Sequence, residues 1–399
     1  MAKNINIKNM NEQFISYLWF NHLFYDHQAT VLGEPLEVIS TGLQNTDAGP
    51  DVFNAKVKVG GTLWAGNVEF HVRASDWHRH HHDNDPAYQN IILHVVLEAD
   101  EQIFSVDGKA FPTVVLSYPD FIRNNYQEIA LRPFGCSSRI QHIDHITKVS
   151  YLEALMVDRL ESKTSNISTI LEHTTNNWDE TLYVLLARSL GSSINSDAMQ
   201  QLALATPLKC LLQHADNPLT LEAALLGQAG LIDRLPEDSN KELYHQEYNF
   251  FRNKFSLAPE YINFRFARMR PTSFPTIRII KLAGLIPEIP KISDLVTKDG
   301  LCKSRLAKIS HLQQINCYLP LLYHYARIHR LDNTAEQVID IMHELPPERN
   351  FITRRFQEMG IIARDAANSQ ALIQLYRTKC ERNDCINCRF AQQILSSNL

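Results

Sequence analysis

The chain has 399 residues, of which 44% are hydrophobic and 21% are charged, and its formal net charge at pH 7 is −5. These proportions are typical of a globular protein, and the length allows a sizeable core and favours two domains. The negative balance excludes a globally basic nucleic-acid-binding protein, so any contact with nucleic acid would come from a local patch. Because the N-terminus has no apolar run and no segment reaches about 18 consecutive apolar residues, we expect no signal peptide and no membrane span.

The cysteine content points to a reducing compartment. There are seven cysteines, an odd number, and three of them fall within nine residues near the C-terminus. This pattern favours a metal site over a disulfide framework. We therefore expect a cytoplasmic protein, while the sequence gives no indication of its oligomeric state.

The first 140 residues combine a helical pattern with several strand patterns. Phe14, Leu18 and Trp19 recur at helical spacing, which predicts a helix over residues 11–24. The further expected elements are a strand at 35–45, a hairpin at 52–72, a loop or short helix at 76–87, a buried strand at 90–99 and a second hairpin at 104–117. This order predicts an α/β domain with a mixed sheet at residues 1–140.

Beyond residue 140 the pattern becomes helical, and turn residues such as those at 217–218 and 346–347 separate the segments. Amphipathic helices are expected at 151–160, 181–190, 219–226, 244–255, 312–330, 334–345 and 369–377. For the whole chain we therefore predict a mixed α+β fold, in which an all-α domain at residues 141–399 follows the mixed sheet.

The most informative polar residues lie in the segment 49–71. A Gly-Gly pair at 60–61 separates two strand-like runs, which is a hairpin signal. Glu69 and His71 are two residues apart, so their side chains point to the same face of the second strand. Asp51 opens the first strand, and a sheet would bring it close to Glu69. Two carboxylates and a third polar group on one face suit a metal site that cleaves phosphodiesters.

The Pro50-Asp51 pair, followed by Glu69-x-His71, resembles the motif of the PD-(D/E)xK phosphodiesterase superfamily. The resemblance implies a nuclease-like N-terminal domain in which Asp51 and Glu69 bind a divalent metal ion. It also implies that Asp51, Glu69 and His71 are the catalytic residues, with His71 in the place of the lysine that positions or activates the attacking water. Histidine can act as a base or bind metal, and it can also mark a site that has lost catalysis.

Most of the chain also resembles an uncharacterised bacterial family of unknown function. The shared blocks are G-P-D-F-x-N-A-K, present here as G-P-D-V-F-N-A-K at 49–56, G-N-V-E-x-H at 66–71, D-W-x-x-H at 76–80 and L-H-V-V at 93–96, together with the C-terminal cysteine cluster. This resemblance assigns the chain to one family and implies no activity.

Four histidines and two aspartates follow the hairpin in a single polar run. Histidine is a common ligand of transition metals. His78 and His82 are four residues apart and would share one face of a helix. We favour His78 and Asp83 as candidate ligands and interpret His80 and His81 as parts of a solvated loop.

Two further residues are candidates for the same site. His94 lies within an otherwise apolar strand, where a histidine is more often a hydrogen-bonded core residue than a ligand. It would reach the site if its strand adjoined that of Glu69. Glu34 lies upstream and could add a third carboxylate. An alternative centre for a transition metal would combine His71, His78 and His94.

Cys380, Cys385 and Cys388 have spacings that suit Zn²⁺ or an iron–sulfur cluster. Their polar neighbours argue against simple burial of the thiols as small hydrophobes. The candidates for a fourth ligand are a histidine and four other cysteines, Cys136, Cys210, Cys302 and Cys317. Some nucleases of the PD-(D/E)xK superfamily hold a [4Fe–4S] cluster with a similar triplet and a distant cysteine, so the resemblance implies this chemistry as one option. The alternative is three unligated cysteines.

Arginines alternate with aromatic residues in the segment 263–278. Guanidinium groups beside aromatic rings suit a phosphate backbone with stacked bases. The alternative is a solvated surface with internal ion pairs. The candidate contacts to nucleic acid are Arg265, Arg268, Arg270 and Arg278.

These patterns together predict a divalent-metal-dependent nucleic-acid phosphodiesterase of unknown substrate. Asp51 and Glu69 would hold Mg²⁺ or Mn²⁺, and His71 would orient or deprotonate the water. The competing hypothesis is a catalytically inactive module that binds nucleic acid or protein and carries a structural metal site.

Overall fold

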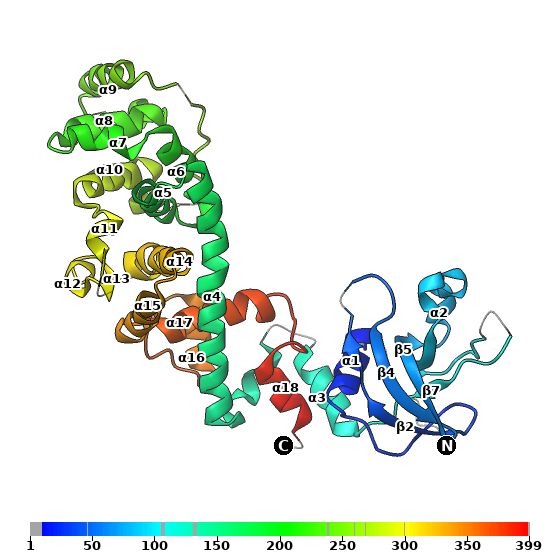
Figure 1. The fold of residues 1–399 in the computed structure, drawn as a ribbon. Coiled ribbons are helices and arrows are strands. Elements are labelled where there is room, and N and C mark those ends of the chain that lie inside the picture. The colour runs from blue at the N-terminus through cyan, green and yellow to red at the C-terminus, as the bar shows by residue number, and fades with distance from the viewer. Residues whose placement is uncertain are drawn as a thin grey trace. The chain divides into compact units, whose positions relative to one another are not determined.

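A sheet unit and a helical unit divide the chain in the computed structural model (Figure 1). The sheet unit consists of residues 1–149, 359–361 and 375–399, and the helical unit consists of residues 150–358 and 362–374. This arrangement confirms the expected mixed α+β fold class. The structure describes residues 10–45, 47–104, 108–130, 134–237, 239–258, 260–267, 269–298 and 300–397.

The elements of the sheet unit follow the predicted alternation of helix and strands. Its strands are β1 (Gln28–Ala29), β2 (Pro35–Ser40), β3 (Leu43–Gln44), β4 (Val52–Val59), β5 (Thr62–Arg73), β6 (Ile91–Glu98) and β7 (Thr113–Val115). Its helices include α1 (Glu12–Phe20), α2 (Asp76–Arg79), α3 (Asp120–Ala130) and α18 (Arg389–Ser396), with the short helices η1 (His82–Asn84), η2 (Pro86–Tyr88), η3 (Gly135–Ser138), η4 (Ile140–His142) and η10 (Tyr376–Cys380).

The central strand β5 joins an antiparallel part of the sheet to a parallel part. The strand order is β1-β2-β4-β5-β6-β7, and β3 pairs with β4. The strands β2, β4 and β5 are antiparallel, whereas β5, β6 and β7 are parallel. The register sets Val52 opposite Val68 and, across the parallel pair, Glu69 opposite His94. The start of β4, the second half of β5 and the middle of β6 therefore lie next to one another.

The helix α1 packs its apolar face on the sheet. It begins at Glu12, where the Asn11 side chain accepts a hydrogen bond from the Phe14 amide at 3.1 Å. Trp19 is fully buried, and its ring centroid lies 5.9 Å from that of Phe70 on β5. Burial of a side chain of this kind stabilises the fold by on the order of 2–3 kcal/mol. The packing fixes the first turn of α1, and with it Glu12, beside the sheet.

Two strand predictions need correction. The segment 35–45 forms two strands, because the chain bends at Gly42, which has a φ of +78° and lies against the backbone of Phe53. The second expected hairpin at 104–117 forms only in part: Phe104 and Ala110 form an antiparallel bridge, residues 105–107 lie outside the described residues, and β7 pairs in parallel with β6, with Thr113 opposite His94. Val114 also forms an antiparallel bridge with Thr30, at the other edge of β7. The edge of β6 offers β7 a longer ladder than the local hairpin does.

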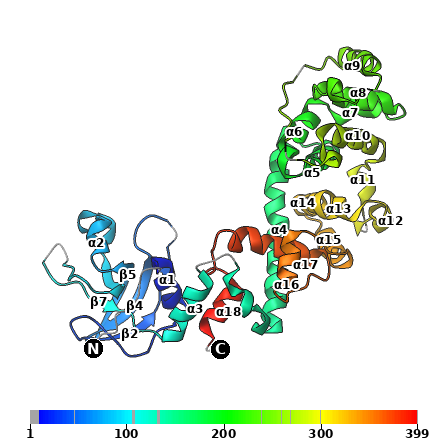
Figure 2. The same cartoon turned by 180° about the vertical axis from the view of Figure 1, so that it is seen from behind.

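The helical unit follows the long helix α4 (His145–His173), most of which belongs to it. Sequential helices pack in pairs, α5 with α6, α8 with α9 and α14 with α15, and Figures 1 and 2 show successive helices stacked along the direction of α4. Its further α-helices and its strands are α5 (Trp178–Leu190), α6 (Ser192–Ala205), α7 (Leu208–Leu211), α8 (Pro218–Gln228), α9 (Lys241–Phe255), α10 (Pro275–Leu285), α11 (Ile292–Leu295), β8 (Val296–Thr297), β9 (Gly300–Leu301), α12 (Lys303–Leu306), α13 (His311–Gln313), α14 (Leu319–His329), α15 (Asp332–Glu344), α16 (Phe351–Glu358) and α17 (Ala366–Leu375), and the short helices between them are η5 (Leu212–His214), η6 (Ile232–Arg234), η7 (Pro271–Ser273), η8 (Ile286–Glu288) and η9 (Gln314–Tyr318).

Among the described residues, every helix is either too short or too polar to cross a membrane.

Candidate metal centre

The β4–β5 hairpin places two carboxylates side by side. Asp51 precedes β4, and its amide donates a hydrogen bond to Glu69 Oε2 at 3.1 Å, while the Phe70 amide donates to Asp51 Oδ2 at 2.9 Å. The loop before Asp51 is held by Asn45, whose side-chain amide donates to the Pro50 carbonyl at 2.9 Å. The structure thus brings Asp51 and Glu69 together at one end of the hairpin.

His71 and His94 form a buried pair on the neighbouring strands β5 and β6. Both rings are fully buried, and His71 Nδ1 lies 2.8 Å from His94 Nε2. The parallel register makes this contact, because it sets His94 opposite Glu69, two residues before His71. A neutral imidazole carries one N–H group, so one ring donates to the other. The remaining nitrogen of His94, Nδ1, is buried without a hydrogen-bond partner among the described residues.

The loop after β5 adds two more histidines. The helix α2 ends at Arg79, with His80 as its C-cap, and His81 adopts a left-handed backbone conformation with a φ of +62°, so that the chain changes direction before His82. His80 Nδ1 lies 3.2 Å from His71 Nε2, and His82 Nε2 lies 3.4 Å from Glu69 Oε1. His81 itself is exposed. The change of direction therefore turns His80 and His82 towards the strand residues and His81 away from them.

Three imidazoles converge at this point. One ring nitrogen from each of His71, His80 and His82 lies within 4.8 Å of the others, a spacing at which the three atoms could hold one metal ion. We refer to these three residues, together with Asp51 and Glu69, as the histidine–carboxylate centre. The side chains of His71 and Glu69 are buried, whereas that of His80 is 38% exposed. The centre therefore opens to solvent on the side of His80.

A third carboxylate reaches the centre from α1. Glu12 Oε1 lies 3.9 Å from His80 Nδ1. The sequence candidate for this role, Glu34, lies instead in the turn between β1 and β2, beside Gly60. The start of β2 pairs with the end of β4, because the two strands are antiparallel. Glu34 is therefore at the opposite end of β4 from Asp51.

His78 and Asp83 pair with each other rather than with the centre. His78 Nδ1 lies 2.8 Å from Asp83 Oδ1, and both side chains are more than one-third exposed. The expected shared helix face of His78 and His82 does not form, because α2 ends before His82 is reached. The alternative centre of His71, His78 and His94 is therefore not assembled in this structure.

Burial dominates the electrostatics of the centre. Burial, followed by the nearby charge of Asp51, raises the pKa of Glu69 to about 9, and burial also raises the pKa of Asp51. Burial lowers the pKa of His71 to about 2 and that of His94 to about 3. At neutral pH the centre thus has a neutral His71 and a protonated Glu69. A bound cation would favour the carboxylate form of Glu69.

The residues of the centre fit a divalent transition-metal ion. Neutral imidazole nitrogens and carboxylate oxygens are ligands that such ions accept. His82 Nε2 is buried, and its contact with Glu69 Oε1 at 3.4 Å is not a hydrogen bond, so a bound metal ion would satisfy this atom. The Trp77 ring packs edge-on against the rings of His71, His82 and His94 and so restricts their rotation.

Three residues around the centre are not predicted as ligands by the sequence. His80 and His82 are indistinguishable from their neighbours by composition, although His80 closes the D-W-x-x-H block and so carried a signal. Glu12 has the pattern of an ordinary acidic residue in the first turn of a helix. No local pattern indicates that this turn meets the centre.

The cysteines divide between the two units. The C-terminal triplet belongs to the sheet unit, as does Cys136 in η3. The other three cysteines, Cys210, Cys302 and Cys317, belong to the helical unit.

The arginine-rich segment lies in the helical unit. Arg265 and Arg270 are exposed, and Arg278 is partly buried. The backbone at Arg265 is fixed by the Asn195 side chain, which donates to the Arg265 carbonyl at 2.9 Å and accepts from its amide at 2.8 Å. Arg268 lies outside the described residues.

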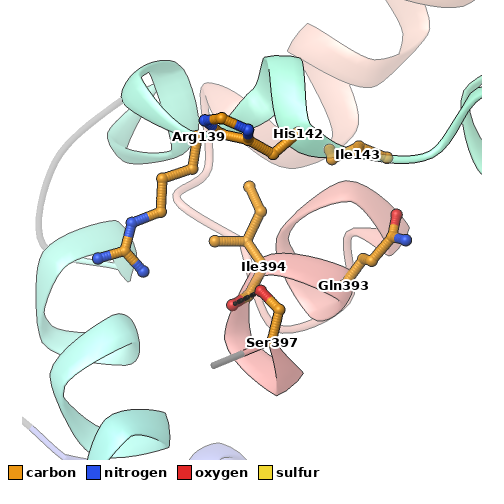
Figure 3. Close-up of a pocket in the computed structure, with 6 residues that line it drawn as sticks. All are labelled: Arg139, His142, Ile143, Gln393, Ile394 and Ser397. Carbon is orange, nitrogen blue, oxygen red and sulfur yellow. Dashed lines mark hydrogen bonds between the residues drawn. The ribbon is translucent and has the colours of Figure 1, made fainter. Parts of the chain in front are cut away.

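A small pocket in the sheet unit is separate from the centre. Figure 3 shows the six residues that line it, which are Arg139, His142, Ile143, Gln393, Ile394 and Ser397. None of them belongs to the histidine–carboxylate centre, so the pocket gives no support for a ligand there.

The fold and the site define a two-unit α+β protein with a candidate metal centre in its sheet unit. The chain belongs to the family described as "Protein of unknown function (DUF2851)", whose match spans residues 12–313. The match runs from α1 to α13 and includes every residue of the histidine–carboxylate centre, whereas the cysteine triplet lies beyond it. The chain matches no curated protein and no solved structure.

Proposed function

We propose that the protein is a divalent-metal-dependent hydrolase of nucleic-acid phosphodiesters and that the histidine–carboxylate centre is its active site. The observation that carries this proposal is the convergence of His71, His80 and His82 within 4.8 Å, beside the Glu69 carboxylate. The P-D and E-x-H pattern of the same hairpin, which resembles that of the PD-(D/E)xK phosphodiesterases, supports the same reaction class.

The resembled motif has a lysine at the position of His71, and the two side chains differ in charge. A lysine would bring a positive charge to the site. Burial lowers the pKa of His71 to about 2, so this ring is neutral at physiological pH. A neutral imidazole can bind a metal ion or accept a hydrogen bond from water, but it supplies no charge. The positive charge must then come from the metal ion, which agrees with a site of three histidines.

The donor set favours Mn²⁺ or Zn²⁺ over Mg²⁺, because Mg²⁺ prefers oxygen ligands. His71, His80 and His82 would hold the ion, and Glu69 would add an oxygen ligand through Oε1. Such an ion polarises a phosphodiester and lowers the pKa of a bound water. His94 would accept the Nδ1–H of His71 and so keep Nε2 of that ring free to bind the metal.

The substrate class is proposed from the helical unit. Arg265 and Arg270 are exposed, and the rings of Phe264 and Phe266 beside them are partly buried. Cations interleaved with aromatic rings suit the phosphates and bases of a nucleic acid. The protein as a whole is negatively charged, so this local surface would have to provide the contact.

Two histidines of one short segment make a matched test. His80→Ala removes a ligand of the centre, whereas His78→Ala removes the partner of Asp83 on the exposed side. We expect wild-type protein and His78→Ala to cleave single-stranded or duplex nucleic acid with Mn²⁺ or Zn²⁺, and His80→Ala to lose at least about 100-fold in rate. His80 is partly exposed, so the substitution should leave the fold intact.

Equal activity of the two variants would contradict the proposed centre. Wild-type protein that binds the metal and yet cleaves no single-stranded, duplex or branched substrate would instead support the competing hypothesis of an inactive interaction module. Calorimetric titration with Mn²⁺ and Zn²⁺ separates these cases, because it reports metal binding without any substrate.

A further inference from the structure

Four of the seven cysteines lie in two neighbouring segments of the sheet unit, although Cys136 is distant from the others in sequence. Cys136 lies in η3, Cys380 ends η10, Cys385 lies in the following loop, and Cys388 precedes the first residue of α18. All four are present as thiols. Cys388 is buried and the other three are partly buried.

The backbone brings η3 and the C-terminal segment to the same end of α3. Gly135 lies so close to α3 that a Cβ at this position would be 2.2 Å from the Ile129 carbonyl oxygen. The Cys385 thiol lies 3.8 Å from the same oxygen. The helix α18 packs on both α3 and η3. Cys136, which directly follows Gly135, is therefore held beside the segment that carries the triplet.

Hydrogen bonds fix the course of this segment. Asn125 on α3 donates to the carbonyl groups of Ile394 and Ser397 at 3.1 and 3.0 Å. Before α18, Lys379 and Asp384 form an ion pair of 2.7 Å. The loop between Cys380 and α18 is polar, yet it is tied down at both ends. Its thiols are thus presented in a defined arrangement rather than on a loose tail.

The cysteines of the two segments also influence one another electrostatically. Burial, followed by the nearby Cys388 and Cys385 thiols, raises the pKa of Cys136 to about 12. Burial raises the pKa of Cys380, with contributions from the other three cysteines. Burial and Cys388 raise the pKa of Cys385 to about 11. A metal bound to these cysteines would stabilise their deprotonated form.

We propose that Cys136, Cys380, Cys385 and Cys388 form a four-thiolate site for a thiophilic metal centre, either one Zn²⁺ ion or an iron–sulfur cluster. Four cysteine ligands are a common set for both. The assignment makes Cys136 the fourth ligand. The site would join the segment after α3 to the C-terminal segment, and it would stabilise the sheet unit because the unfolded chain has no preformed site. It is independent of the proposed hydrolase activity.

The test uses the whole chain, purified without oxygen, and measures zinc, iron and acid-labile sulfide together with the visible absorption spectrum. X-ray absorption at the metal edge identifies the ligands, since sulfur scatterers distinguish this site from the histidine–carboxylate centre. We expect a shell of four cysteine sulfurs per metal centre for zinc, or brown protein with inorganic sulfide for an iron–sulfur cluster. Either result supports the proposal and identifies the metal.

Three variants assign the fourth ligand. Cys136→Ser should lose the sulfur-bound metal down to background, whereas Cys210→Ser, a buried cysteine of the helical unit, should retain all of it. Cys136→His keeps a metal-binding side chain and should retain zinc with three sulfurs and one nitrogen. This variant and the wild-type ligand count remain informative even if Cys136→Ser folds poorly.

Two results would overturn the proposal. One is wild-type protein, prepared without oxygen, that contains no sulfur-bound metal. The other is folded Cys136→Ser protein that keeps a full shell of four sulfurs.

Discussion

The two units bury different kinds of polar side chain. Among the described residues, the buried acidic and histidine side chains all belong to the sheet unit and lie between positions 69 and 94. The helical unit buries hydroxyl and amide side chains, such as Thr181, Gln228 and Gln370. These satisfy nearby groups: Thr181 donates to the Asn177 carbonyl at 2.8 Å, and Gln228 donates to the Ala258 carbonyl at 2.7 Å.

The difference separates buried polar groups that are stabilised by hydrogen bonds from buried ionisable groups that destabilise the fold. A buried amide costs little once it is hydrogen-bonded, whereas a buried ionisable group shifts its pKa or remains destabilising. Most of the polar interior of the helical unit is thus explained by helix and loop hydrogen bonds, with the Tyr183 hydroxyl and the Thr206 hydroxyl as exceptions among the described residues. That of the sheet unit is not, which is why we place the chemistry there.

The largest expected effect comes from Glu69→Gln. Glutamine has the same shape and can still accept the Asp51 amide hydrogen bond, so the fold should survive. It lacks the negative charge that the metal requires, so metal-dependent cleavage should fall by on the order of 10³-fold. The measurement is the initial rate with Mn²⁺ or Zn²⁺, with the melting temperature as control. A variant that is folded and fully active would remove Glu69 from the centre.

The next effect concerns the positioning residue His94. His94→Phe keeps an aromatic ring in the buried position but removes the nitrogen that contacts His71 Nδ1 at 2.8 Å. Loss of such an outer partner should weaken metal binding by about 10–100-fold. Calorimetric titration with Zn²⁺ measures this change. His94→Gln, whose amide oxygen can accept the same hydrogen, should recover part of the affinity; identical affinities for both variants would argue for a packing role only.

In the helical unit, Gln228→Leu should lower stability and leave metal binding unchanged. The substitution removes the partner of the Ala258 carbonyl and of the Tyr248 hydroxyl, which donates to Gln228 Oε1 at 3.1 Å. Leaving such groups unsatisfied costs about 1–3 kcal/mol. Chemical denaturation measures the loss, and Zn²⁺ titration of the folded variant provides the contrast. A weakened metal affinity would break the distinction drawn between the two units.

Metal affinity should also depend on pH. Burial, with the help of Asp51, raises the pKa of Glu69 to about 9, so below this pH the metal must displace a proton from the carboxyl. Affinity should therefore rise up to about tenfold per pH unit between pH 7 and 9. His71 adds nothing in this range, because its lowered pKa leaves it neutral. A flat profile for the wild-type protein, or the same slope in Glu69→Gln, would contradict this origin.

In the metal-free protein, the stability contributed by Glu69 falls as the pH rises, whereas the metal affinity rises with pH. The carboxyl of Glu69 titrates near 4.5 in the unfolded chain and near 9 in the folded protein, so the folded state holds the proton more tightly. Its contribution to stability is present below about pH 4.5 and is lost as the pH rises towards 9. Below about pH 6.5 the buried His71 and His94, whose pKa values are lowered, act in the opposite direction, because the unfolded chain binds their protons. Thermal melts of metal-free protein should therefore show the decline between about pH 7 and 9, and added Zn²⁺ should reduce it.

The smallest effect is expected at the exposed arginines of the helical unit. The double substitution Arg265→Glu and Arg270→Glu should weaken binding to nucleic acid without changing the melting temperature, since both residues are exposed. The slope of affinity against salt concentration should decrease by about one for each phosphate that the variant no longer binds. Filter binding at several salt concentrations measures this slope. An unchanged slope would place the nucleic-acid surface elsewhere.

Local rules made the strand part of the centre predictable. Alternation along a strand sets Glu69 and His71 on one face, and a Gly-Gly turn sets Asp51 beside them. The position of His94 beside these residues could be predicted only if its strand adjoined β5, and the parallel pairing of β5 and β6 meets this condition. A two-residue period and a turn type are encoded within a few neighbours, so they can be recognised without the fold.

Changes of chain direction and remote contacts made the rest unpredictable. The left-handed residue His81 decides that His80 and His82, rather than His78, enter the centre. Glu12 arrives by packing of a whole helix on the sheet, and Glu34 is excluded by the direction of β2. Cys136 was one of several candidates for the fourth thiol, because nothing near it in sequence indicates the C-terminal segment.

The sheet unit takes its last helix, α18, from the end of this sequence, and this affects how the protein is made. Domains usually fold in the order in which they leave the ribosome. Residues 1–149 must wait here for residues 375–399. At about 5–20 residues per second, the intervening synthesis lasts on the order of 10 s or more. A ribosome that stalls within the helical unit would therefore leave a sheet without α18, so the nascent protein would depend on protection by chaperones until translation has passed α18.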